Sequence, residues 1–178
     1  NRPVLVIHIM VASLNIFEDA LFAAMAAIGF SSISNTPRRT YAACALAAAT
    51  GHAVRFMLMS PGWFGMNIIP ASAVAAFVVG LLAVLMAPMV KCPAEVCLFP
   101  ALLPMIPGMY AYKTVFSMIM FMQNLDDPSA AGYLAAIVRN GFVTFSVIFM
   151  LAAGAAAPIF LFNKRAHSLT RNKKQIRS

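Results

Sequence analysis

Charged residues are scarce in this sequence, and acidic residues are the scarcest. Asp and Glu number 5 of 178 residues, and all charged residues make up 10% of the chain, against about 25% in an average soluble domain. Apolar residues make up 62%, and the mean hydropathy is +0.84. Because a chain of this size cannot bury so much apolar surface in its own core, the composition excludes a water-soluble monomer. It also excludes general disorder.

Cysteine is sparse as well, and its spacing is uninformative. The chain has three cysteines, Cys44, Cys92 and Cys97. An odd number without regular spacing predicts no disulfide framework. No ligand partners accompany them at the usual metal-site spacing, so the sequence predicts no metal and no cofactor. The sequence also contains no recognisable catalytic motif that pairs a nucleophile with a general base. We therefore expect no enzyme, and an intramembrane enzyme with His52 as base is the least favoured alternative.

Long apolar runs are what the sequence does have. A bilayer core of about 30 Å needs about 20 helical residues. Five runs qualify, and they cover residues 4–35, 40–60, 67–90, 94–124 and 129–162. The sequence thus predicts an all-α polytopic membrane protein with about five transmembrane helices. Residues 1–163 form a single transmembrane domain, within which 1–16 either extend a tilted first helix or lie on the membrane as an interfacial helix, and 164–178 form a basic cytoplasmic tail.

The 13 Lys and Arg residues give a net charge of +8, and most of them can be explained by topology. With five spans, nine cations fall on one side of the membrane: Arg38, Arg39, Lys91, Lys164, Arg165, Arg171, Lys173, Lys174 and Arg177. Only Arg2 falls on the other side, together with Asp126 and Asp127. The positive-inside rule then predicts a cytoplasmic C-terminus and an outside N-terminus. A lipid bilayer is the expected partner of these charges, and nucleic acid is not.

Five ionisable residues within the spans stand out, because charge is costly there and usually faces a bundle interior or a water path. Asp19 and Arg55 have similar depths, which predicts an ion pair or a shared polar site, and His52 lies one turn from Arg55. This polar cluster could handle protons. The alternatives are that Arg55 only snorkels outward and that His52 only packs. Lys113 and Arg139 lie well inside the fourth and fifth spans, which favours a functional or inter-subunit role.

The fourth run contains a proline-rich interruption. Pro100, Pro104 and Pro107 are followed by Gly108, and no straight helix passes through such a stretch. We predict a broken span whose second helix starts at Gly108 and directs backbone N–H groups toward an anionic solute, with Lys113 about one turn later. The alternative is a packing kink that neighbouring helices repair. Because cations outnumber acids in the spans, the predicted solute carries a carboxylate.

These residues also carry a family resemblance. The elements are residues 24–33 with Pro37, then 44–46, then Gly51-His52-x-x-Arg55-x-x-Leu58-Met59, then Pro104-Met105-x-Pro107-Gly108-x-x-Ala111-Tyr112. Together they resemble the YjjB-type membrane subunit, which is similar to the C-terminal half of ThrE-type threonine/serine exporters. The resemblance covers about residues 19–165.

The resemblance implies a bacterial inner-membrane exporter of threonine and serine, or of a C4-dicarboxylate such as succinate. It implies a separate partner, a YjjP-type subunit that corresponds to the N-terminal half of ThrE, and a homo-oligomer is compatible with it. Asp19, His52, Arg55, Pro104, Pro107, Gly108 and Tyr112 match the family pattern, whereas Lys113 and Arg139 do not obviously match it. We assign Pro104, Pro107, Gly108, Tyr112, Lys113 and Arg139 to the solute path. A non-transporting scaffold subunit, with Lys113 and Arg139 buried against a partner, is the alternative.

Overall fold

The computed structural model describes residues 2–162, with side chains from residue 15 onward, and its helices follow the apolar runs. The elements are α1 (Arg2–Ile33), η1 (Arg38–Thr40), α2 (Tyr41–Met59), α3 (Ile68–Val90), α4 (Ala94–Leu102), η2 (Leu103–Met105), α5 (Gly108–Gln123) and α6 (Ala130–Leu161). No strand occurs among the described residues. The predicted all-α fold is confirmed, and the predicted basic tail lies outside the described residues.

The helices have the length and composition of membrane spans. Residues Asn15–Ile33, Arg38–Met59, Ile68–Val90 and Ala130–Leu161 each qualify alone. Residues Ala94–Met105 and Gly108–Gln123 qualify together as one span that is bent by 54°. The structure therefore agrees with about five spans and with a break in the fourth. The α1 helix runs without interruption from Arg2 to Ile33.

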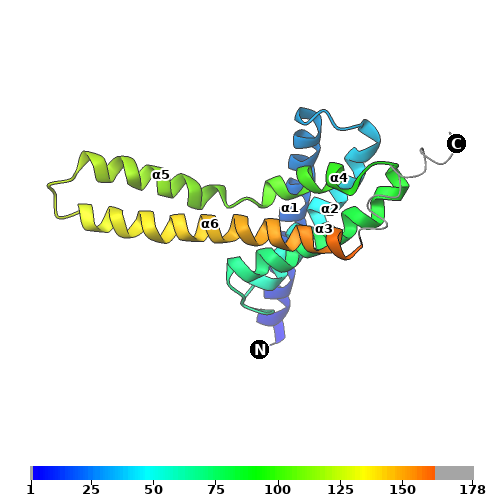
Figure 1. The fold of residues 1–178 in the computed structure, drawn as a ribbon. Coiled ribbons are helices and arrows are strands. Elements are labelled where there is room, and N and C mark those ends of the chain that lie inside the picture. Colours follow the sequence, from blue (N-terminus) through cyan, green and yellow to red (C-terminus); the bar gives the residue numbers. More distant parts are fainter. Residues whose placement is uncertain (1, 163–178) are drawn as a thin grey trace, which may run out of the picture.

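Small residues form the core where α1 to α4 and the second half of α6 meet (Figure 1). Ala47, Ala75 and Val79 are fully buried. A Cβ atom added at Gly51 would collide with the Val79 side chain, so glycine permits the close approach of α2 and α3. Lipid is as apolar as these side chains, so membrane helices associate by close packing of small residues more than by burial of large ones.

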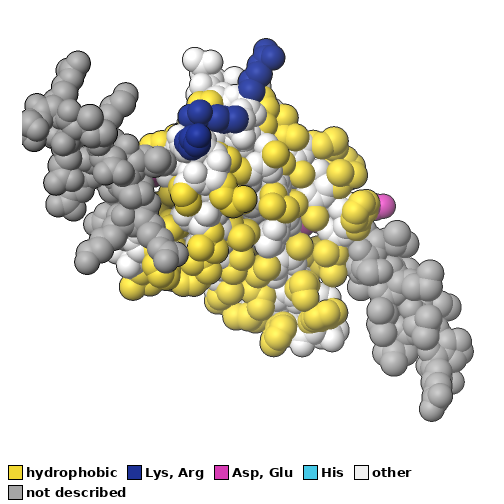
Figure 2. All heavy atoms as spheres, turned by 90° about the vertical axis from the view of Figure 1, so that its right-hand side faces the viewer, with side chains coloured by type: hydrophobic (Ala, Val, Ile, Leu, Met, Phe, Trp, Pro, Cys, Tyr) yellow, Lys and Arg dark blue, Asp and Glu magenta, His cyan; other side chains and the backbone are white. Residues whose placement is uncertain are grey.

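The two loops that carry the predicted cytoplasmic cations meet at one end of this bundle. Arg39 donates from Nη2 to the backbone oxygen of Lys91 at 3.0 Å, and Lys91 ends α3 in the left-handed conformation, at φ 51°. Figure 2 looks onto this end and shows Lys and Arg side chains gathered at one edge above a largely hydrophobic surface. The contact explains why the turns after α1 and α3 stay together.

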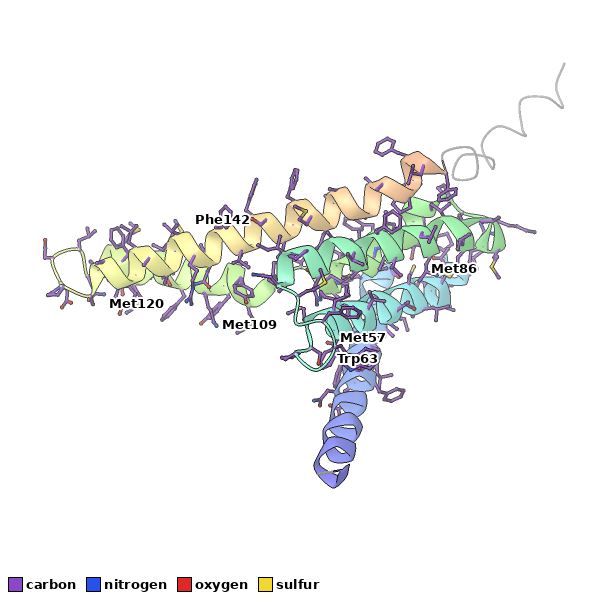
Figure 3. All side chains as sticks on the ribbon, turned by 90° about the horizontal axis from the view of Figure 1, so that it is seen from below. Met57, Trp63, Met86, Met109, Met120 and Phe142 are labelled. Atoms are coloured by element: carbon purple, nitrogen blue, oxygen red, sulfur yellow. The ribbon has the colours of Figure 1, made fainter. Side chains whose placement is uncertain are left out.

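The α5 and α6 helices form an antiparallel hairpin that projects beyond the α1–α4 bundle (Figure 1). The second half of α6 packs against α3, where glycines allow close contact. A Cβ atom at Gly80 would lie 2.6 Å from the carbonyl oxygen of Ala155, and one at Gly154 would meet the carbonyl of Ala73. The first half of α6 and all of α5 lie outside this packing, and Figure 3 shows Met109, Met120 and Phe142 along this arm.

Candidate functional site

The polar cluster forms where α1, α2 and the broken fourth span meet. The Asp19 carboxylate is on α1 and the His52 imidazole is on α2. An Asp19 oxygen lies 3.1 Å from His52 Nδ1, within hydrogen-bonding distance. The His52 side chain is 8% exposed and the Asp19 side chain 40%. The His52 Nε2 atom is buried, and no group of the described residues lies in hydrogen-bonding geometry to it. The cluster therefore holds one satisfied imidazole nitrogen and one that could take a proton or a water molecule.

The Arg55 guanidinium binds the break itself. Its Nη1 donates to the backbone oxygen of Met105 at 2.8 Å. In a continuous helix that carbonyl would accept from the N–H of residue 109, but η2 ends at Met105 and α5 begins at Gly108. Interrupted backbone at membrane depth needs a polar partner, and Arg55 supplies it. This observation favours the alternative that a neighbouring helix stabilises the kink. The group that does so is the Arg55 side chain of α2, which binds the Met105 carbonyl.

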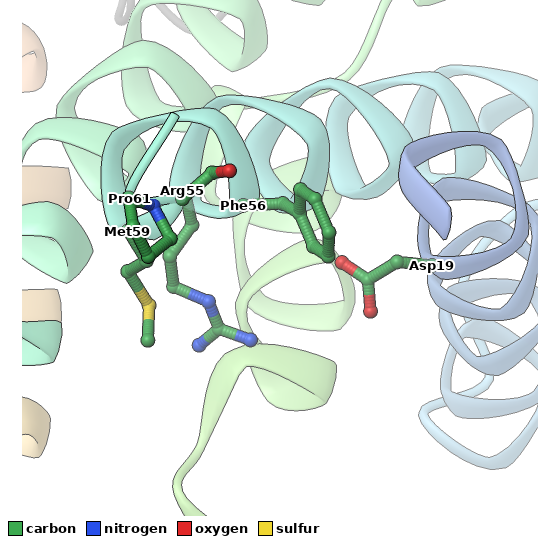
Figure 4. A pocket seen from close by; sticks show the side chains of 6 residues that line it. Asp19, Arg55, Phe56, Met59 and Pro61 are labelled. Carbon is green, nitrogen blue, oxygen red and sulfur yellow. The ribbon is translucent and has the colours of Figure 1, made fainter. Parts of the chain in front are cut away.

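Arg55 and Asp19 also line one cavity of about 370 Å³, together with Phe56, Met59, Ser60 and Pro61. Figure 4 shows their side chains reaching into this space from two different helices. The volume lies within the range of about 300–1,000 Å³ that is usual for small-molecule sites. No ion pair joins Asp19 to Arg55 among the described residues. Of the two predicted arrangements, the shared polar site forms and the direct ion pair does not, because His52 and Met105 occupy these groups.

The remaining predicted residues are not part of this cavity. Gly108 is exposed, and its N–H donates to the backbone oxygen of Ile106 at 2.8 Å, so it is not free for a solute. Pro107 is buried, and Pro104 is half-buried. Tyr112 is exposed and stacks on Phe116, with ring centroids 6.1 Å apart. Lys113 and Arg139 are exposed on the α5–α6 hairpin, and the structure does not bring them to Arg55.

Sequence reasoning missed the apolar and backbone parts of the site. Phe56, Met59, Ser60 and Pro61 line the cavity, but the sequence indicated only the end of a span at Pro61. The carbonyl of Met105 could have been inferred, because a proline break always leaves carbonyl groups without helical partners. No spacing rule pairs it with Arg55, which lies 50 positions away in the chain.

Comparison with known proteins identifies the family. The family described as "Threonine/Serine exporter, ThrE" matches residues 19–161 of this chain. A protein of Haemophilus influenzae (strain ATCC 51907 / DSM 11121 / KW20 / Rd), named "Uncharacterized protein", is 30% identical over 158 residues. The match covers 88% of this chain and 51% of that protein, so this chain spans about half the length of the curated relative. No solved structure matches the chain. The polytopic fold and the family match agree, and the chain belongs to the threonine/serine exporter family, ThrE.

Proposed function

We propose that this chain is a subunit of a secondary transporter that exports threonine and serine across the bacterial inner membrane. The observation that carries the proposal is the cavity that Arg55 and Asp19 line with opposite charges, each from a helix long and apolar enough to span a membrane. Charges within membrane spans usually mark solute or ion paths. The membership in a family of exporters agrees with this role and gives no support to an enzymatic one.

The two charges favour an amino acid over a dicarboxylate. An α-amino acid carries one carboxylate and one ammonium group, which complement the Arg55 guanidinium and the Asp19 carboxylate. Arg55 uses one N–H on the Met105 carbonyl, and a guanidinium has five N–H donors, so donors remain for a solute carboxylate. A dicarboxylate such as succinate would place its second negative charge near Asp19. Among the carboxylate-bearing solutes of the family resemblance, the cavity therefore fits threonine and serine best.

The Asp19–His52 pair is the proposed site of coupling to protons. Histidine changes its charge between about pH 5 and 8, and its Nδ1 is within 3.1 Å of an Asp19 oxygen. Protonation of His52 would alter the charge that Asp19 presents to the solute ammonium. Solute binding and proton binding would then depend on each other through one carboxylate.

The proposed arrangement has this chain working with a second membrane subunit. The curated relative is about twice as long as the region it shares with this chain, which leaves room for a second unit of the YjjP type. In this arrangement the Arg39 and Lys91 end faces the cytoplasm, following the positive-inside rule. The cavity beside Ser60 and Pro61 then lies toward the outer side, and the α4–α5 break is connected to it through the bond from Arg55 to the Met105 carbonyl.

The test is an export assay in cells from which the gene has been removed. Intracellular threonine, serine and succinate are measured with the gene restored as wild type, Arg55→Ala or Asp19→Asn, at matched membrane levels. We expect Arg55→Ala to retain threonine and serine in the cell, with export lowered by about tenfold or more, since a charged hydrogen bond is worth about 1.5–3 kcal/mol. We expect Asp19→Asn to lower export of the two amino acids similarly.

Succinate separates the two solute classes. If the chain transported a dicarboxylate, Asp19→Asn would leave succinate export unchanged or higher, and gene removal would raise intracellular succinate and not threonine. Unchanged export in both variants at normal membrane levels would instead favour the scaffold alternative.

A further inference from the structure

The α5–α6 hairpin suits neither water nor lipid by itself. Within the described chain, Ser117 is the one buried residue of the 16 in α5. Large apolar side chains are exposed on both helices, among them Met109, Val115, Phe116, Met122, Phe142 and Phe145. Water would not tolerate such an apolar surface. Lipid would tolerate it, but Lys113 and Arg139 are exposed on the same arm, and lipid-facing cations are costly.

The two cations lie at a similar distance from the tip of the hairpin. Lys113 is ten residues before the end of α5 at Gln123, and Arg139 is nine residues after the start of α6 at Ala130, which places both about 14–15 Å from the tip at 1.5 Å per residue. The tip itself is polar. Asp127 is exposed, and its carboxylate accepts a hydrogen bond from the Ser129 N–H at 2.8 Å, which holds the pKa of Asp127 below its usual value.

The two cations also lie on the same side of the hairpin. The seam between the helices passes through Thr114, next to Gly141, and through the buried Asn140. Lys113 directly precedes Thr114, and Arg139 directly precedes Asn140. In an antiparallel helix pair, positions with the same offset from the seam fall on the same side of the pair. Lys113 and Arg139 therefore contribute to one positively charged face.

Small residues on α6 leave room for another helix at this face. Gly132 and Ala135 stand seven and four residues before Arg139, on the same helical stripe. Both are exposed, and a Cβ atom added at Gly132 would meet nothing within 4 Å. Stripes of small residues let membrane helices approach closely. Here the stripe ends at Arg139, which forms no ion pair with any of the described residues.

A second copy that meets this face with its own Lys113–Arg139 face cannot supply the missing charge. The five acidic residues are Glu18, Asp19, Glu95, Asp126 and Asp127. Asp126 and Asp127 are at the hairpin tip, Glu95 begins α4, and Glu18 and Asp19 belong to α1, where Asp19 pairs with His52. In a parallel two-fold dimer equal depths meet, so Lys113 and Arg139 would face cations of the same kind.

We propose that the Lys113–Arg139 face of the α5–α6 hairpin docks a different membrane protein, through transmembrane helices that bear carboxylates at the matching depth. The charge of this face and the depth of its cations argue for that partner. The curated relative, of which this chain spans 51%, carries enough further sequence for it. The proposal rests on the proposed function only in that both require a second subunit, and it assigns Lys113 and Arg139 to docking in place of solute binding.

The test is site-specific photocrosslinking in intact cells that contain the whole native complex. A photoreactive phenylalanine analogue replaces Phe116 or Phe142 on the hairpin, and Leu85 on α3 is the matched control, since it is also apolar and 48% exposed. We expect the two hairpin positions to crosslink to one membrane protein other than this chain, with the crosslinked peptide next to an intramembrane Asp or Glu. We expect Leu85 to give lipid adducts. Crosslinks of the hairpin to a second copy, or to lipid alone, would overturn the proposal.

Charge variants then test the chemistry of the contact. Lys113→Asp with Arg139→Asp should lower the Phe116 crosslink by about tenfold or more, because two carboxylates would then face each other at a buried contact. Exchanging the partner's crosslinked acid for Lys should restore it, and Lys113→Arg should preserve it. Lys113→Met keeps the chain insertable, since it removes an intramembrane charge, and should still lose the crosslink; an unchanged crosslink in this variant would contradict the ion-pair contact.

Export measurements separate this proposal from the proposed function. Arg55→Ala should lose export and keep the hairpin crosslink, whereas the hairpin charge variants should lose both. A hairpin that crosslinks to a second copy while Arg55→Ala still abolishes export would overturn the docking proposal alone. A preserved crosslink with no threonine or serine export in the wild type would overturn the proposed function alone.

Discussion

At the scale of single residues, the choice of partner by Arg55 determines which charged groups line the cavity. Arg55 could bind either the Asp19 carboxylate or the Met105 carbonyl. Asp19 and Arg55 have opposite charges and similar depths, yet Asp19 pairs with His52 at 3.1 Å and Arg55 binds the Met105 carbonyl at 2.8 Å. A direct ion pair would neutralise both charges and leave the broken backbone without a partner. The observed arrangement keeps both charged groups on the cavity and stabilises the break.

His52 provides a residue-scale prediction about proton coupling. In His52→Asn, the side-chain amide nitrogen can replace Nδ1 as the partner of Asp19, and no group at this position titrates near neutral pH. We expect this variant to export threonine but to lose the pH response that we expect of the wild type between about pH 5 and 8. Export from preloaded cells or vesicles, measured across that range, checks the prediction.

The matched control for His52 is His52→Gln, whose amide lies nearer to the position of Nε2. It should lose the contact with Asp19, so both export and its pH response should fall. A pH response in His52→Asn equal to that of the wild type would assign proton coupling to another group.

At the scale of helices, the break between α4 and α5 provides the second prediction. Pro107→Ala combined with Gly108→Leu restores a backbone donor and removes a flexible residue, which favours a continuous helix. Position 108 accepts a Cβ atom without a clash, since no atom of the described residues would lie within 4 Å of it. A continuous helix would reclaim the Met105 carbonyl from Arg55. We therefore expect threonine export to fall by about tenfold or more at normal membrane levels, as for the loss of one charged hydrogen bond, and unchanged export would show that the break has only a packing role.

The contact of α3 with α6 depends on glycine, and this gives the third prediction. Gly80→Ala would place a Cβ atom 2.6 Å from the Ala155 carbonyl oxygen and 3.1 Å from Pro158, and overpacking of this kind costs about 1–3 kcal/mol. Gly29→Ala adds the same methyl group to α1 with nothing within 4 Å. We expect the thermal unfolding midpoint of purified protein to fall for Gly80→Ala and to stay equal or rise for Gly29→Ala. Equal midpoints for the two variants would mean that α3 and α6 can separate without cost.

At the scale of the whole molecule, charge sorting predicts the orientation in the membrane. The native cysteines are 0–5% exposed, so cysteines introduced elsewhere can be labelled selectively. We expect Phe64→Cys and Asp127→Cys to react with a membrane-impermeant maleimide added to whole cells, and Arg38→Cys to react only after permeabilisation. Labelling of Arg38→Cys from outside would reverse the proposed topology.

The number of helices and their ends could be predicted from the sequence because lipid imposes a simple rule. A span needs about 20 apolar residues, and charges or Pro-Gly pairs end it. The run at 67–90 corresponds to the α3 helix of Ile68–Val90, and the run at 129–162 to the α6 helix of Ala130–Leu161. The break was also predictable, since Pro104 and Pro107 remove backbone donors wherever the helix lies.

The partners of the polar groups could not be predicted in the same way. The membrane depths inferred from the sequence placed Asp19, His52 and Arg55 near one another. They could not decide which of these side chains pair. It also placed Lys113 and Arg139 within spans without revealing that their helices project from the bundle as a hairpin. Side-chain pairing depends on the rotation and the lateral neighbours of each helix, and apolar runs carry little information on either.

The sequence by itself thus determined the solvent, the helices and the broken span, because these follow from local composition in a uniform apolar medium. Only the tertiary structure decided that Arg55 binds the Met105 carbonyl and that, within the described chain, Asp19 and Arg55 share a cavity without a direct ion pair. It also decided that α5 packs mainly against α6 within the described chain. The physical reason is that close packing of small residues, such as Gly51, Gly80 and Gly154, fixes which helices touch. That packing is a property of matched surfaces, and it leaves the two cations of the hairpin uncovered.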